Sequence, residues 1–285
     1  MTVLVITVTV LVAEVIGAVV SGSLALVADA GHMLTDVAGL TLAWVALALA
    51  QRPVTLARTW GFRRAEVLAA AGQAAVLLAV GGFVLVEGIR RLFDPPEVAS
   101  AAMLIFGGVG LAGNMIGIAV LAGSRSENLN MRAAFLEVVN DALGSVAVLV
   151  AAAVIAVTGW SRADALASLL IGVLIIPRTL KLLRESVDVL LESTPKGLEL
   201  NEVREHLLAV AHVRAVHDLH ATQVATALPV LTAHVVVDDS CFHDGHLPSL
   251  LDELQQCLAG HFDVEHCTIQ FEAGSHAAHE PSAHP

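Results

Sequence analysis

Long apolar stretches occupy the first two thirds of the chain. Six of them are long enough to cross a lipid bilayer, which takes about 20 residues in a helix. They cover approximately residues 2–20, 25–50, 65–91, 101–123, 131–157 and 162–182. The connections between them are short. The pattern therefore predicts an α-helical membrane protein whose residues 1–184 form a transmembrane domain of six helices.

The pattern changes after residue 197 to that of a small soluble domain. Helical periodicity places Leu200, Val203, Leu207 and Val210 on one face. Segments that alternate and are rich in β-branched residues are typical of strands. The expected order is helix 198–211, strand 213–225, strand 228–239, helix 247–260 and strand 264–272. We expect a cytosolic α+β domain (α-β-β-α-β) over residues 198–273, after a linker at 185–197. Residues 274–285 have little to bury and predict a disordered, histidine-containing tail.

Composition supports a membrane protein, because 56% of the 285 residues are hydrophobic and only 15% are charged. The formal net charge of −12 excludes the basic character that a nucleic-acid partner requires. The three cysteines all lie in the soluble domain without a C-x-x-C pair, which predicts reduced thiols in a cytosolic domain.

Basic residues are unevenly distributed among the loops. The second and fourth connections and the end of the sixth span carry Arg52, Arg58, Arg63, Arg64, Arg125, Arg132, Arg178, Lys181 and Arg184. The opposite loops hold only Arg90, Arg91 and Arg162. Because basic loops stay in the cytoplasm, we expect a multi-pass protein of the cell membrane with both termini cytoplasmic.

Two predicted spans carry clusters of ionisable residues. The second contains Asp29, His32 and Asp36, and the fifth contains Glu137 and Asp141. His32 and Asp36 are four residues apart, as are Glu137 and Asp141, so each pair lies on one helical face. Ionisable residues in a span are costly unless paired, and their default interpretation is functional. Imidazole with carboxylates suits a divalent ion of the zinc type, and Mn²⁺, Fe²⁺ or Co²⁺ remain compatible. The alternative is that these groups only pair with one another and hold helices together.

Other polar residues in the spans favour structural roles. Glu14 and Glu87 are single carboxylates, for which packing or membrane-edge roles are expected. Gln73 and Asn114 are expected to form hydrogen bonds between helices.

Four segments together resemble the cation diffusion facilitator family, on its zinc-exporting bacterial branch. They are "SGSLALVADAGHMLTD", "RTWGFRRAEVLAA", "NLNMRAAFLEVVNDALGSVAV" and "TIQFE". The resemblance implies a transport site formed by His32 and Asp36 with Glu137 and Asp141. The family commonly has His where this chain has Glu137, so the site is more anionic. Zn²⁺ is the expected ion, with Co²⁺, Cd²⁺, Ni²⁺, Mn²⁺ and Fe²⁺ as further candidates. Asp29 is not a usual ligand, and it is expected to tune proton affinity or packing.

The resemblance also implies that the cytosolic domain pairs with its twin and binds metal. The matching positions are His217, His234, His266 and Glu272, with His220 as a weaker candidate. The loops "QRPVTLARTWGFRRAE" and "GSRSENLNMR" lack histidine, so we expect no metal site in either. The "CFHDGH" loop and the tail histidines are alternatives for weak metal capture.

The function implied is efflux of a divalent metal cation from the cytoplasm by proton antiport. The expected partners are metal ions, protons, membrane lipid and a second copy of the chain. No enzymatic activity and no cofactor are expected. A membrane metallohydrolase is disfavoured because no H-E-x-x-H motif occurs in the spans. A metal sensor that does not transport remains an alternative.

Overall fold

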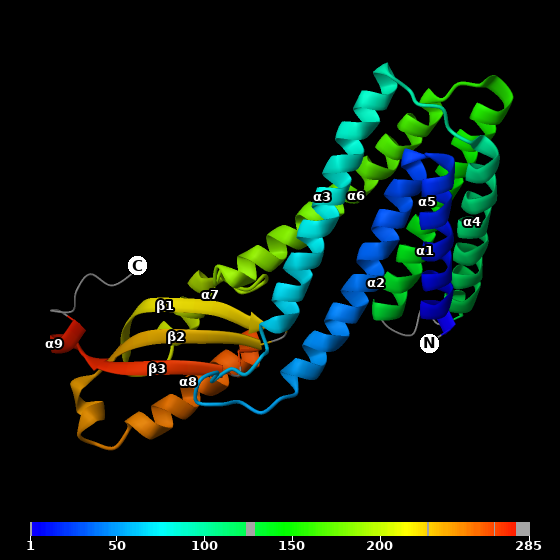
Figure 1. The fold of residues 1–285 in the computed structure, drawn as a ribbon. Coiled ribbons are helices and arrows are strands. Elements are labelled where there is room, and N and C mark those ends of the chain that lie inside the picture. Colours follow the sequence, from blue (N-terminus) through cyan, green and yellow to red (C-terminus); the bar gives the residue numbers. More distant parts are fainter. Residues whose placement is uncertain (1, 124–128, 227, 265, 278–285) are drawn as a thin grey trace. The chain divides into compact units, whose positions relative to one another are not determined.

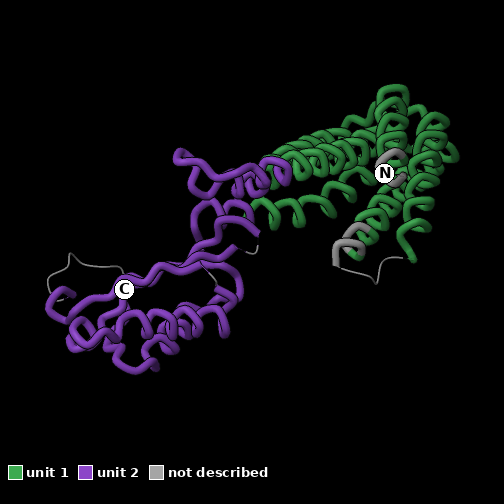
Figure 2. Tube along the Cα trace, turned by 90° about the horizontal axis from the view of Figure 1, so that it is seen from below, with its two compact units in different colours: residues 1–45, 69–184 green, residues 46–68, 185–285 purple. Residues whose placement is uncertain are grey.

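The computed structural model describes residues 2–123, 129–226, 228–264 and 266–277 (Figure 1). The chain divides into two compact units, shown in two colours in Figure 2. The first unit extends to residue 45 and resumes over 69–184, and the second comprises 46–68 and 185–285. The sequence places residues 46–68 in the transmembrane domain, whereas by their contacts they belong with the second unit.

The first unit is built from six helices, as the apolar pattern predicts. They are α1 (Thr2–Ser21), α2 (Leu24–Ala50), α3 (Ala65–Phe93), α4 (Ser100–Ala122), α5 (Leu129–Thr158) and α6 (Arg162–Leu190). Among the residues searched, five stretches are long and apolar enough to cross a membrane, and Ile6–Ser21 of α1 is a shorter apolar helix. The six-helix architecture is therefore confirmed. Helix α6 continues beyond the predicted end at residue 182, because no helix-breaking residue occurs between Pro177 and Pro195.

Glycines set the close packing within this unit. Helix α4 packs against α1 and α5, and its buried face includes Gly107, Gly110, Gly113 and Gly117. A side chain at Gly113 would collide with Val10 of α1. Small residues allow backbones to approach where lipid provides no hydrophobic drive for association. This close approach brings polar groups of α1, α2, α4 and α5 together in the interior.

Asp164, in the first turn of α6, caps the amino terminus of α2. Its carboxylate accepts hydrogen bonds from Ser23 Oγ at 2.5 Å, from the Leu24 amide at 2.7 Å and from the Ala25 amide at 3.1 Å. The side chain is 1% exposed, and Arg91 of α3 lies 3.7 Å away. The first amides of a helix have no partner within the helix and carry partial positive charge. One carboxylate therefore joins three helices at one end of the unit.

The second unit contains a small α+β domain, as predicted. Its main elements are α7 (Leu200–Leu208), β1 (Val213–Ala225), β2 (Leu228–Val237), α8 (Leu247–Phe262) and β3 (His266–Ala273). A short 3₁₀ helix, η1 (Asp239–Phe242), and a one-turn helix, α9 (Gly274–Ala277), are added to this order.

The three strands form one sheet in the order β1-β2-β3. Strands β1 and β2 pair antiparallel, and β2 and β3 pair parallel through the crossover helix α8. Helices α7 and α8 cover one face of the sheet with Val203, Leu207 and Leu254, which are completely buried. The other face carries both polar and apolar side chains.

The two segments predicted to be irregular are partly helical. Helix α6 continues to Leu190, inside the predicted linker at 185–197. The predicted disordered tail begins with the short helix α9 at Gly274–Ala277. The rest of the tail, including His279 and His284, lies outside the described residues.

We predict that Asp164→Ala lowers the free energy of unfolding by about 2–3 kcal/mol, because it leaves three buried donors without their acceptor. Thermal unfolding of the detergent-solubilised protein measures this loss. The matched control is Asp94→Ala, which removes an exposed carboxylate after the end of α3. Equal melting temperatures for the two variants would show that the cap does not hold the helices together.

Candidate metal sites

Three predicted ligands of the transport site converge between α2 and α5. The Nε2 atom of His32 lies 3.6 Å from Oδ2 of Asp36 and 3.5 Å from Oδ1 of Asp141. One potential ligand atom from each residue lies within 4.8 Å of the other two. His32 and Asp36 meet because they are one turn apart on α2, as their spacing predicts.

The cluster is largely shielded from solvent. The exposed fractions of the side chains of His32, Asp36 and Asp141 are 12%, 22% and 10%. His32 Nδ1 and Asp141 Oδ1 are buried and have no hydrogen-bond partner among the described residues. An imidazole nitrogen and two carboxylates are suitable donors for a divalent ion of the zinc type. These unpaired atoms therefore fit a cation-binding role better than a purely structural one.

The fourth predicted ligand is placed differently. Glu137 lies one turn before Asp141 on α5, and its carboxylate forms an ion pair with Arg178 of α6. It is not part of the converging group. The sequence analysis counts Arg178 among the basic residues at the end of the sixth span, and it does not predict the ion pair with Glu137. A basic residue one turn from the predicted end of an apolar span is the signal that could have indicated it.

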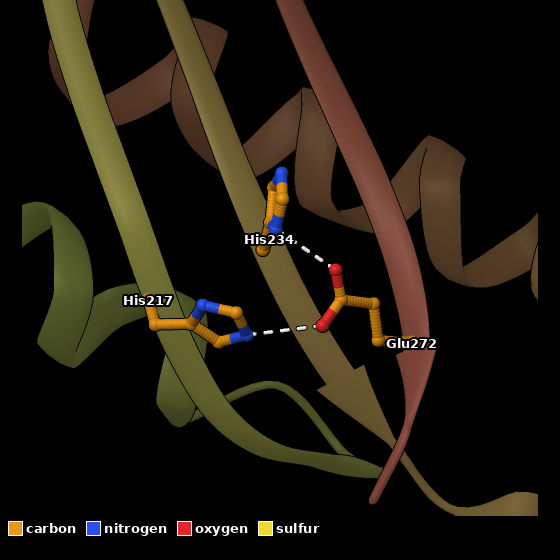
Figure 3. Close-up of side chains that lie close together, drawn as sticks. All are labelled: His217, His234 and Glu272. Carbon is orange, nitrogen blue, oxygen red and sulfur yellow. Dashed lines mark hydrogen bonds and ion pairs between the residues drawn. The ribbon is translucent and has the colours of Figure 1, made fainter. Parts of the chain in front are cut away.

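The second cluster lies in the α+β domain, where His217, His234 and Glu272 come from three adjacent strands (Figure 3). Glu272 Oε2 lies 3.0 Å from His217 Nε2, and Oε1 lies 2.8 Å from His234 Nδ1. The Glu272 side chain is 1% exposed. Its carboxylate thus joins the two imidazoles.

Strand register explains why these three residues meet. His217 of β1 and His234 of β2 are directly paired, and Glu272 of β3 pairs with Val236, two residues beyond His234. Residues two apart on a strand share a face. The neighbours Ala233 and Val235 belong to the hydrophobic core, so the cluster lies on the sheet face opposite the helices.

His266, the remaining predicted ligand, is not brought to this cluster. It begins β3, six residues before Glu272, and a strand rises about 3.3 Å per residue, so about 20 Å separate them. Its ring instead packs edge-on against Trp60, with centroids 4.9 Å apart. His220 is not among the converging donors either, but it lies close by: its Nε2 atom is 3.0 Å from Asp218 Oδ1, and Asp218 Oδ2 is 3.7 Å from His234 Nε2.

The cysteines are free thiols, in agreement with the sequence. Cys241 is buried in the hydrophobic core. Burial raises the pKa of the Cys257 thiol, with a further contribution from Glu253, and burial also raises the pKa of Cys267. Protonated thiols are poor metal ligands. Within the described parts of the chain, only the two clusters above bring three or more His, Cys, Asp or Glu ligand atoms together.

Comparison with known proteins identifies the family of both parts of the chain. Residues 1–191 match the model of the cation efflux transmembrane domain, and residues 195–274 match that of the cation efflux protein cytoplasmic domain. The metal cation efflux system protein CzcD of Cupriavidus metallidurans is 43% identical over 93% of this chain and 83% of its own length. The zinc transporter ZitB of Escherichia coli is 40% identical over 95% of this chain and 85% of its own.

Two further similarities are to a relative from another organism and to the solved structure of a single domain. The cadmium, cobalt and zinc/H(+)-K(+) antiporter of Bacillus subtilis is 34% identical over 93% of this chain and 86% of its own length. A solved structure of the metal-bound C-terminal domain of the CzcD transporter from Cuprividus metallidurans covers 26% of this chain and 99% of its own, at 40% identity and a TM-score of 0.24. The matches to both domains, together with relatives above 30% identity over nearly the whole length, show that the chain belongs to the cation efflux family.

Proposed function

We propose that this protein exports divalent metal cations, Zn²⁺ foremost, from the cytoplasm in exchange for protons. The observation that carries the proposal is the convergence of His32, Asp36 and Asp141 from α2 and α5 inside an apolar helical unit. Such a cluster is costly within a membrane unless it binds a cation. The relatives named for zinc, cadmium and cobalt transport support the same class of substrate.

Proton exchange follows from the chemistry of the ligands. A metal binds imidazole and carboxylate only in their deprotonated forms, so protons and metal compete for the cluster. Moving a divalent cation outward against about 100 mV, inside negative, costs about 4.6 kcal/mol. Two protons moving inward offset this electrical cost. The Bacillus subtilis relative is named a cadmium, cobalt and zinc/H(+)-K(+) antiporter, which supports the exchange of metal for protons.

We further propose that the chain works as a homodimer in the cell membrane, with both termini cytoplasmic. The basic residues of the second and fourth connections and of the end of α6 favour that orientation. The cluster of His217, His234 and Glu272 binds a regulatory divalent ion. Its donors sit on paired strands, so binding requires little rearrangement of the domain.

A membrane metal sensor that does not transport is the second candidate, because a sensor would use the same two clusters. Proteoliposomes containing zinc-sensitive and pH-sensitive dyes separate the two functions. Zinc entry accompanied by opposite proton movement supports exchange, whereas zinc binding without flux supports a sensor.

We predict that Asp36→Ala and Asp141→Ala each reduce zinc flux to background. Each substitution removes one of three converging donors, and no other described donor joins the group. The assay is zinc uptake into proteoliposomes at matched protein content, with Asp94→Ala as the control. Near-normal flux in either cluster variant would rule out the proposed transport site.

We predict that Glu137→His raises the ratio of zinc to manganese flux. A nitrogen donor favours zinc, whereas carboxylate oxygen favours manganese, and the substitution also releases Arg178 from its ion pair. Flux of both metals is compared at several pH values. The control is Glu137→Gln, which releases Arg178 without supplying a nitrogen ligand. If both variants change the ratio equally, the effect arises from Arg178 and Glu137 is not a ligand.

We predict that His234→Ala weakens zinc binding at the sheet cluster by at least about tenfold, as expected for loss of one of three ligands. Calorimetry in an Asp36→Ala background isolates this site from the transport cluster. His206→Ala, on α7 and outside the cluster, serves as the control. Equal affinities for the two variants would exclude the strand histidines as ligands.

A further inference from the structure

A second polar cluster lies inside the first unit, apart from the three converging metal donors. It is formed by Glu14 of α1, Asp29 of α2, Asn114 of α4 and Ser145 of α5, which are 0%, 2%, 6% and 0% exposed. Four helices thus bring four polar side chains into an apolar interior. The sequence predicts a packing or membrane-edge role for Glu14 and hydrogen bonds between helices for Asn114, and only the packing shows that the two residues share one place.

Hydrogen bonds run in one direction through this cluster. Asn114 Nδ2 donates to Ser145 Oγ at 3.2 Å, and Ser145 Oγ donates to Asp29 Oδ2 at 3.3 Å. The Asp29 and Glu14 carboxyl groups in turn act directly on each other. These two hydrogen bonds therefore end at Ser145 and Asp29, and neither of them reaches Glu14.

Glu14 is the buried group left unsatisfied. Neither of its carboxylate oxygens accepts a hydrogen bond from any described residue. A side chain at Gly110 would collide with Glu14 Oε1 and approach Ser145 Oγ, so the carboxylate points into the cluster beside this glycine. A side chain at Gly144 would likewise press on Asp29 Oδ1. The two glycines provide the room for two carboxyl groups.

These two carboxyl groups have no basic partner within the part of the chain that the structure describes. Asp29 and Asp141 are the charged groups that act on Glu14, and both are acidic. His32, one turn along α2, acts on Asp29. Within the described residues, no arginine or lysine forms an ion pair with either carboxylate. Two facing acceptors become a hydrogen bond only when a proton lies between them, and two adjacent carboxylates cannot both remain ionised in a low-dielectric interior.

We propose that Glu14 and Asp29 form a proton-binding site that holds one shared proton and releases it when metal binds at His32, Asp36 and Asp141. This inference rests on the proposed exchange of metal for protons. Asp29 precedes His32 by three residues, a rise of about 4.5 Å along α2. A divalent ion bound by His32, one turn away, favours the ionised form of this carboxyl group. Metal arrival thus expels the proton, and metal departure allows it to return.

The site explains how a proton can be carried without using a metal ligand. The three converging donors bind either metal or protons. Glu14 and Asp29 bind only the proton, and they keep their places beside Ser145 and Asn114 throughout the exchange. The charge of the interior changes less during the exchange, because a proton leaves as the cation enters. This limits the electrostatic cost of exposing the cluster to opposite sides of the membrane in turn.

The test uses Glu14→Gln in the full-length protein. The glutamine amide supplies permanently the donor that the shared proton supplies in the native pair, so the variant should fold and bind zinc. Protons released at zinc saturation are counted by calorimetry in two buffers of different ionisation enthalpy. We expect the count per chain to fall by up to about one proton, since binding linked to deprotonation releases that proton. Zinc binding at the sheet cluster contributes equally to both proteins and cancels in the difference.

Glu87→Gln is the matched control. It also removes a carboxylate from a predicted span, but Glu87 is already paired with Arg91 at 3.0 Å, so its proton count should equal that of the wild type. An unchanged count in Glu14→Gln, with zinc still bound, would overturn the proposal. If Glu14→Gln does not fold, Asp29→Asn should give the same decrease.

Infrared difference spectra of the wild type give an answer that needs no variant. Zinc should remove the C=O stretching band of a protonated carboxylic acid, and absence of that loss would also overturn the proposal. Failure of the proposed function looks different, because zinc would then enter wild-type proteoliposomes without any proton counterflow. Counterflow in the wild type with an unchanged count in Glu14→Gln would reject only the shared-proton site.

Discussion

Charged side chains within an apolar helical bundle must be neutralised, because the surrounding medium solvates them poorly. The first unit meets this constraint in different ways at different places. Asp164 is neutralised by the amide ends of α2 and by Arg91. Glu137 is paired with Arg178. Within the described residues, no arginine or lysine forms an ion pair with Asp36 or Asp141, which instead meet His32, as the proposed binding site requires.

The packing of small residues makes these arrangements possible. Gly110 of α4 and Gly144 of α5 leave room for the carboxyl groups of Glu14 and Asp29. A larger residue at either position would displace a carboxyl group. The glycines of α4 thus allow the helices to pack closely, and they also leave space for the buried polar groups.

The two candidate metal-binding clusters differ in how their donor groups are held. In the α+β domain the donors stand on hydrogen-bonded strands, so their spacing is fixed by the sheet register. In the helical unit the donors come from two helices that meet through side chains. Separate helices can shift relative to one another, whereas paired strands cannot without breaking their ladder. A rigid site suits regulation, and a site between helices suits alternating exposure of a transported ion.

The sequence by itself determined the six apolar helices, the order of elements in the α+β domain and the pairing of His32 with Asp36. These features depend on local periodicity, which is written in consecutive residues. The sequence could not decide which donors from different elements meet. Tertiary packing placed Glu137 beside Arg178, and strand register brought Glu272 to His217 and His234. Helix packing also brought Glu14, Asp29, Asn114 and Ser145 together, because contacts between residues 31 and 116 positions apart depend on how whole helices pack and not on any local pattern.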